Sequence, residues 1–182
     1  MTDTLYGFKK APKLSMGSHN YPEEGMCIME LVSFINRDWE DFSDTPESVH
    51  PQIVMYMQST NDQCEDDERV HLLSVLDRMF HTGDMTVEQN WDFGNLITSK
   101  EEQFEALIGY SDLAFGSRYL PGVWRYLCGF AASPAPLADK LAVLNLILDC
   151  ADEAMGVTEV LPQNREVIEQ MLENLMSSEE GK

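Results

Sequence analysis

Apolar side chains along this chain recur every three to four residues, which is the spacing of one buried face of an α-helix. The first such stretch begins at Pro22, since proline suits the first turn of a helix, and it ends near Asp38. Its apolar stripe consists of Cys27, Ile28, Leu31, Phe34 and Ile35. No stretch alternates apolar and polar residues for long enough to indicate a β-strand. The pattern therefore predicts an all-α protein.

The same spacing predicts more helices along the rest of the chain. Their expected ranges are 51–61, a stretch that starts between residues 61 and 64, 99–115, 120–131, 136–155 and 164–177. Gly83 and Gly156 are expected to end two of these helices, because glycine readily adopts the left-handed backbone of a helix C-terminus. The helix over 136–155 is apolar on most sides and is expected at the centre of the core. Residues 85–100 are ambiguous, because Gly94 breaks their pattern.

The length of 182 residues fits a single domain with a core of its own. We expect a compact helical bundle of about six to eight helices over residues 21–178. Residues 1–20 contain glycine, proline and a small group of lysines, which predicts an extended N-terminal arm. Residues 179–182 are expected to be a frayed tail.

The net charge of -20 is the most unusual property of the composition, with 32 acidic residues against 12 lysines and arginines. The acidic residues are spread along the whole chain. Such a surface repels phosphate backbones, so direct binding to nucleic acid is not expected. It attracts basic surfaces, including the basic grooves of enzymes that act on nucleic acids. The same charge also serves solubility, and both interpretations stay open.

The four cysteines are widely separated and form no C-x-x-C pair, which gives no support to a zinc ribbon or a thioredoxin-like motif. We expect reduced thiols in a cytoplasmic protein. The N-terminus shows no signal-peptide pattern, and no apolar stretch has the length of a membrane span, so no membrane partner is expected.

Acidic residues cluster where several helices are expected to start. These residues are Glu23, Glu24, Glu65, Asp66, Asp67, Glu68, Glu101 and Glu102. Negative charge in the first turn of a helix is favoured by the helix dipole, which is the structural interpretation. The alternative interpretation is that these carboxylates bind a partner.

The motifs of phosphate-binding loops, zinc proteases and serine hydrolases of the G-x-S-x-G type are absent, so no catalytic residue, metal or cofactor is predicted by motif. The most suggestive local cluster is His19, Cys27 and Glu30. Cys27 and Glu30 share a helix face, and His19 is close enough in sequence to fold over that turn. A thiolate near a helix N-terminus has a lowered pKa, which would suit a nucleophile or a metal ligand. The alternative is a buried structural cysteine with a capping histidine.

Several short stretches resemble a group of small proteins carried by phages and bacteria. They are G-S-H-N-Y-P-E-E-G-M-C-I-M-E at 17–30, V-H-P at 49–51, N-D at 61–62, D-E-R at 67–69 and S-D-L-A-F-G-S-R-Y-L-P-G-V-W-R-Y-L at 111–127. The small size, the strong acidity and the absence of catalytic motifs resemble those of type II anti-CRISPR proteins, which are inhibitors of the RNA-guided CRISPR endonuclease. This resemblance implies a cytoplasmic protein of a bacterial host cell that binds the endonuclease with its guide RNA and has no catalytic activity.

Three functions therefore stay open from the sequence. The first is an anti-CRISPR protein that inhibits a guide-loaded endonuclease through its acidic surface. The second is a small metal-binding or thiol enzyme that uses His19, Cys27 and Glu30. The third is a helical interaction protein whose partner the sequence does not identify. Homo-oligomer formation is also open.

Overall fold

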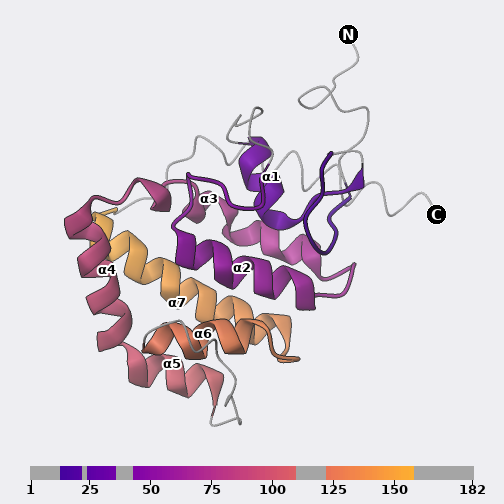
Figure 1. Ribbon diagram of the computed structural model, residues 1–182. Helices are drawn as coiled ribbons and strands as arrows, with labels where there is room; N and C mark the ends of the chain where they lie inside the picture. Colours follow the sequence, from indigo (N-terminus) through magenta and orange to yellow (C-terminus); the bar gives the residue numbers. More distant parts are fainter. Residues whose placement is uncertain (1–12, 22–23, 36–42, 110–121, 158–182) are drawn as a thin grey trace.

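The computed structural model of the protein describes residues 13–21, 24–35, 43–109 and 122–157 (Figure 1). These residues form seven α-helices and two 3-10 helices, with a single isolated β-bridge and no strand. The α-helices are α1 (Ile28–Ile35), α2 (Pro51–Gln63), α3 (Leu76–Met79), α4 (Val87–Ser99), α5 (Glu101–Ile108), α6 (Val123–Ala131) and α7 (Leu137–Met155). The 3-10 helices are η3 (Arg69–Val75) and η4 (Thr82–Asp84). The predicted all-α class is confirmed.

Helix α7 lies at the centre of the helical body, as its sequence predicts. It packs against α2, α4, α5 and α6, and Figure 1 shows it running through the middle of the group. Its fully buried apolar residues are Val143, Leu144, Ile147, Leu148 and Ala151. Gly156 ends the helix in the left-handed conformation, with φ at 68°, which confirms its predicted role.

Helix α4 occupies the stretch whose pattern is ambiguous in the sequence. Its start is fixed by a capping box, in which the Thr86 hydroxyl accepts from the backbone N–H of Gln89 and the Gln89 side chain accepts from the backbone N–H of Thr86. Gly94 lies inside the helix on a side where a Cβ atom would contact nothing within 4 Å. The two local bonds compensate for the low helix propensity of that glycine.

Two predicted helix boundaries are wrong. A single helix was expected over 99–115, but Ser99 ends α4 and the chain bends at Lys100 before α5 begins at Glu101. Gly109 follows α5 with φ at 69°, and residues 110–115 lie outside the described residues. Gly83 does not end an α-helix; it is the middle residue of η4.

The described part of the predicted N-terminal arm packs against the helical body. Leu14 is buried and forms the isolated β-bridge with Met26. The backbone N–H of Ser15 donates to the Met26 carbonyl oxygen at 2.8 Å, and that of Met26 donates to the Lys13 carbonyl oxygen at 3.0 Å. Residues 1–12, the predicted helix over 164–177 and the predicted tail lie outside the described residues.

In the described part of the chain, no helix combines the length and the apolar character that a membrane span requires.

Candidate functional site

The start of α1 is built around Cys27 and Glu30. Cys27 directly precedes the helix, and its backbone N–H donates to the Glu30 carboxylate at 2.7 Å. The backbone N–H of Glu30 in turn points at the Cys27 sulfur at 3.4 Å. This is the reciprocal arrangement of a capping box, with a thiol in place of the usual hydroxyl.

The predicted start of this helix at Pro22 is wrong for the residues that the structure describes. Residues 24–27 are not α-helical, and the helix begins at Ile28. Gly25 has φ at 124°, a backbone conformation outside the helical region that side chains rarely adopt. Helix α1 therefore begins only at Ile28, after the glycine and at the capping box formed by Cys27 and Glu30.

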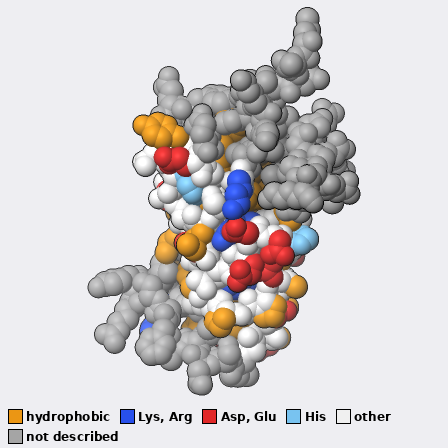
Figure 2. All heavy atoms as spheres, turned by 90° about the vertical axis from the view of Figure 1, so that its right-hand side faces the viewer, with side chains coloured by type: hydrophobic (Ala, Val, Ile, Leu, Met, Phe, Trp, Pro, Cys, Tyr) orange, Lys and Arg blue, Asp and Glu red, His pale blue; other side chains and the backbone are white. Residues whose placement is uncertain are grey.

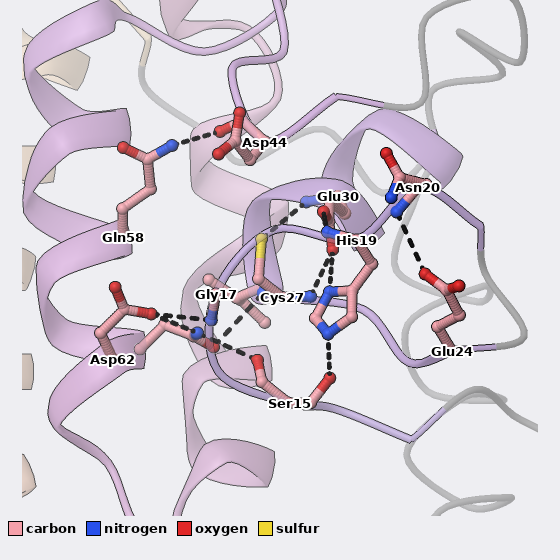
Figure 3. Close-up of polar contacts among 12 residues, drawn as sticks. Ser15, Gly17, His19, Asn20, Glu24, Cys27, Glu30, Asp44, Gln58 and Asp62 are labelled. Atoms are coloured by element: carbon pink, nitrogen blue, oxygen red, sulfur yellow. Dashed lines mark hydrogen bonds and ion pairs between the residues drawn. The ribbon is translucent and has the colours of Figure 1, made fainter.

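His19 folds over the first turn of α1, as its position in the sequence suggested. Its backbone N–H and its ring Nδ1 atom both contact the Glu30 carboxylate, the ring contact at 2.8 Å (Figure 3). Because a carboxylate accepts hydrogen bonds, Nδ1 carries a proton in this arrangement. The structure thus brings His19, Cys27 and Glu30 together.

The other ring nitrogen of His19 contacts a residue that the sequence pattern did not single out. The Nε2 atom lies 3.0 Å from the Ser15 hydroxyl oxygen. Figure 3 shows Ser15, His19 and Glu30 in a row, with the imidazole between the hydroxyl and the carboxylate. Ser15 belongs to a stretch without helical periodicity, so only the fold reveals this contact.

The three side chains differ in how far they are exposed. The Glu30 side chain is 1% exposed and that of His19 is 14% exposed, while Ser15 is half-buried. A buried carboxylate is tolerated when donors surround it, and here the N–H groups of His19 and Cys27 and the imidazole supply them.

Of the two alternatives for Cys27, the structure favours the buried structural cysteine over the thiolate with a lowered pKa. Burial raises the pKa of this thiol to about 12, and the neighbouring Glu30 charge contributes in the same direction. Hydrogen bonds from the helix N-terminus oppose the rise but are weaker. The thiol therefore stays protonated at neutral pH, which does not suit a thiolate nucleophile.

The last turn of α2 supports this cluster from one side. The Asn61 side chain donates to the Ser15 carbonyl oxygen at 3.1 Å and accepts from the backbone N–H of Ile28 at 3.4 Å. The carboxylate of Asp62 accepts from the backbone N–H of Gly17 at 3.1 Å. Both residues were noted only as part of a resembling stretch, because nothing in their spacing indicates a site.

Residues 65–68, which we call the acidic turn, follow α2 directly. They were expected in the first turn of an α-helix, but they form a turn before η3, so that expectation is wrong. Arg69 is buried and donates to the carbonyl oxygens of Asn61 at 3.2 Å and Cys64 at 2.6 Å. Its guanidinium thereby caps the C-terminus of α2 and ends that helix before the acidic residues.

Asp66 connects the acidic turn to the N-terminal segment. It pairs with Lys13 at 2.8 Å and also contacts Arg69. The hydrogen bond from Lys13, followed by that from Arg69, lowers the pKa of Asp66. Figure 2 shows Asp and Glu side chains gathered beside Lys and Arg side chains on this side of the molecule.

The remaining predicted acidic positions do not join this turn in one cluster. Glu101 and Glu102 are exposed in the first turn of α5, as expected, at the end of the molecule away from α1 (Figure 1). Glu24 is exposed and accepts from the backbone N–H of Asn20 at 3.3 Å. Glu23 lies outside the described residues.

The described residues offer two distinct chemical features, which are a hydroxyl, imidazole and carboxylate in a row and a widely acidic exterior. Within the described ranges, no group of three or more His, Cys, Asp or Glu side chains is arranged to hold a metal ion. Comparisons of the chain with protein-family models, with curated proteins and with solved structures found no match.

Proposed function

We propose that this protein acts by binding, through its acidic exterior, to a positively charged macromolecule, and that this binding function involves no conversion of a substrate. The partner that we propose is a type II CRISPR endonuclease loaded with guide RNA, which the protein inhibits. The choice of partner rests on the resemblance of residues 17–30 and 111–127 to small proteins of phages and bacteria, and on the resemblance of the overall profile to type II anti-CRISPR proteins.

The observation that carries the binding proposal is the distribution of charge over the described surface. Exposed acidic residues occur on α2, η4, α4, α5 and α7 and in the segments that precede α1 and flank α2. They are Glu24, Glu47, Asp62, Glu65, Asp66, Asp67, Asp84, Glu88, Asp92, Glu101, Glu102, Glu105, Asp139, Asp149 and Glu153. Such a surface creates a negative potential that reaches into the solvent and selects basic partners.

The basic residues do little to offset this potential. Arg69 and Lys140 are buried. Lys13 pairs with Asp66, Arg78 with Asp149 and Asp152, and Lys100 with Glu153. Most of the positive charge in the described residues is therefore inside the protein or neutralised locally.

A guide-loaded CRISPR endonuclease is a suitable target for such a surface. It holds its RNA–DNA heteroduplex in a positively charged channel and reads a short duplex motif with arginines. Carboxylates on an acidic protein can occupy sites that otherwise receive phosphates. Binding of this kind requires no active site and no cofactor.

The experiment that tests the proposal is a pull-down with purified guide-loaded endonuclease at low and high salt, together with a DNA cleavage assay. We expect association that weakens at high salt, because exposed charges are screened beyond ~10 Å at 0.1 M ionic strength. We also expect slower cleavage of target DNA. Absence of association at both salt concentrations would remove this endonuclease as the partner.

Two charge-reversal variants locate the contact. Glu65→Lys with Asp67→Lys alters the acidic turn, and Glu101→Lys with Glu102→Lys alters α5 by the same change in net charge. Asp66 is left in place because it pairs with Lys13 and Arg69. A larger loss in one variant identifies the surface used, and equal losses indicate the overall charge. Unchanged binding in both would contradict the proposal.

The thiol or metal-binding enzyme suggested by His19, Cys27 and Glu30 has weaker support. The raised pKa of Cys27 disfavours a thiolate, and the Glu30 carboxylate is already occupied by N–H donors from His19 and Cys27. If the endonuclease does not bind in the pull-down but another basic protein does, the chain is a helical interaction protein with a different partner.

A further inference from the structure

Ser15, His19 and Glu30 have the geometry of a nucleophile, a base and a group that orients the base. The Ser15 hydroxyl oxygen lies 3.0 Å from His19 Nε2, and His19 Nδ1 lies 2.8 Å from the Glu30 carboxylate. Both distances are within hydrogen-bond reach. A hydroxyl is a weak nucleophile on its own and becomes reactive when an oriented base faces it.

The orientation of the imidazole follows from its carboxylate partner. Because Nδ1 faces the Glu30 carboxylate, the tautomer that fits this contact has its proton on Nδ1, and in that tautomer the lone pair of Nε2 faces the Ser15 hydroxyl. The carboxylate itself is held by the backbone N–H groups of His19 and Cys27. The base is therefore fixed in the tautomer that accepts a proton from the hydroxyl.

The backbone around Ser15 is held on both sides. Its N–H donates to Met26, and its carbonyl oxygen accepts from the Asn61 side chain. Gly25 provides the room for the hydroxyl, because a Cβ atom at that position would lie 2.4 Å from the Ser15 oxygen. Ser15 is half-buried, so part of its surface is reachable from solvent.

The Ser15 hydroxyl is not the N-cap of α1. Serine hydroxyls near helix starts usually accept a hydrogen bond from the helix backbone. That role is taken at α1 by Cys27, whose sulfur faces the Glu30 N–H. The Ser15 hydroxyl instead faces an imidazole.

We propose that Ser15 is a nucleophile that accepts an acyl group from small esters, with His19 as the general base and Glu30 as a positioning residue. The Ser15 oxygen forms a bond to the ester carbonyl carbon while its proton moves to His19 Nε2. The bond to the leaving alcohol then breaks, and the alcohol takes that proton. Water, deprotonated by the same imidazole, then attacks the acyl carbon. The bond between that carbon and the Ser15 oxygen breaks, the oxygen takes the proton back from His19, and the carboxylic acid leaves.

The neighbouring charges define the class of ester. The carboxylate of Asp62 contacts the backbone of Gly17, two residues from Ser15. Anionic esters are disfavoured near this carboxylate, so neutral or cationic esters are expected. This activity goes beyond the proposed binding function and does not depend on it.

The test is covalent labelling of the full chain with a neutral fluorophosphonate, which forms an oxygen–phosphorus bond to an activated serine as fluoride leaves. Peptide mass spectrometry is expected to find the label on Ser15. Ser15→Ala is expected to lose it, while Ser18→Ala, a change at an exposed serine of the same segment, is expected to keep it. His19→Gln is expected to slow labelling by roughly 100-fold or more, since a general base contributes about 100-fold to 10,000-fold.

Controls keep the outcome decisive. Circular dichroism and urea midpoints identify variants that fail to fold; if His19→Gln is one of them, His19→Asn replaces it. No label on Ser15, equal labelling of several serines, or a labelling rate that is unchanged by substitution of His19 would overturn the proposal. Ser15→Ala is expected to lose the label but to bind the endonuclease as the wild type does, so the two proposals can fail independently.

Discussion

The hydroxyl of Tyr56 donates a hydrogen bond to the backbone carbonyl oxygen of Lys140, 3.0 Å away, and so connects α2 to α7. Tyr56 is fully buried, so water has no access to replace the hydroxyl as a donor. Burial also raises the pKa of Tyr56, which keeps the hydroxyl protonated over the working pH range. The contact joins the central helix to the helix that supports the candidate site.

Tyr56→Phe is expected to lower the free energy of unfolding by about 1 kcal/mol, the net value of one buried hydrogen bond. Urea denaturation measures this change. Tyr126→Phe is the matched control, because Tyr126 is 54% exposed and a surface change of this kind stays within about 0.5 kcal/mol. Equal effects of the two substitutions would contradict the role of the Tyr56 hydroxyl.

Gly83 lies against the backbone of residues 47–49. Its N–H donates to the Ser48 carbonyl oxygen at 2.9 Å. A Cβ atom at this position would lie 2.0 Å from the Glu47 carbonyl oxygen and 2.8 Å from the Val49 nitrogen. Since these are backbone atoms, they cannot rotate away as a side chain can. The glycine is needed for close approach of two chain segments.

Gly83→Ala is expected to destabilise the protein by roughly 1–3 kcal/mol, the usual cost of overpacking, or more because backbone is involved. Gly94→Ala is the control with the opposite sign. Gly94 lies in α4 with open space around it, so alanine is expected to stabilise the helix by about 1 kcal/mol. Thermal melts of both variants provide the comparison. A neutral result for Gly83→Ala would show that the two segments separate easily.

The helices that the sequence predicts best are those with strong apolar periodicity. The stretch 136–155 carries its own stop signal at Gly156, and α7 follows both features closely. The prediction fails at boundaries decided by contacts from distant residues. Arg69, for example, ends α2 by donating to the backbone carbonyl oxygens of Asn61 and Cys64. No local sequence pattern predicts that its side chain contacts the preceding helix.

The candidate site was predictable only where its contacts are local in the sequence. Cys27 and Glu30 are three residues apart, so their contact follows from helical spacing. Ser15 reaches His19 because residues 13–15 pair with the chain near Met26, which is a tertiary contact. The sequence left two alternatives for Cys27, a thiolate with a lowered pKa and a buried structural cysteine, and the raised pKa caused by burial favours the second.

Asp152 of α7 lies between two basic side chains, Arg78 of α3 and His81 in the turn after that helix. Arg78 donates to its carboxylate at 2.7 Å, and His81 Nε2 lies 3.5 Å from the other oxygen. Burial alone raises the pKa of Asp152, but the contacts with His81 and Arg78 outweigh burial and lower it below 3.8. The ionised Asp152 carboxylate therefore contributes fully to folding stability above pH 3.8, the ordinary pKa of an aspartate. This contribution is lost as the pH falls through the lowered pKa of Asp152 in the folded protein.

Asp152→Asn is expected to lower stability at neutral pH and to make the loss of stability in acid less steep. The reason is that asparagine cannot take up the proton that the wild-type carboxylate gains when the protein unfolds. Urea midpoints measured from neutral to acidic pH test this. Asp139→Asn, at an exposed position of the same helix, is expected to follow the wild-type curve. If Asp152→Asn keeps the wild-type slope, another carboxylate dominates the acid response.

The thiols of the native protein are expected to resist alkylation at mildly alkaline pH. Burial raises the pKa of Cys27 from 9.0 to about 12, which lowers its thiolate fraction on the order of a thousandfold. Burial likewise raises the pKa of Cys128 and Cys150 to about 11 and raises that of Cys64. Iodoacetamide labelling, with peptide mass spectrometry to separate the four sites, is expected to be slow in buffer and fast in urea. Selective labelling of Cys27 in the native protein would contradict this expectation and favour a thiol enzyme at the site.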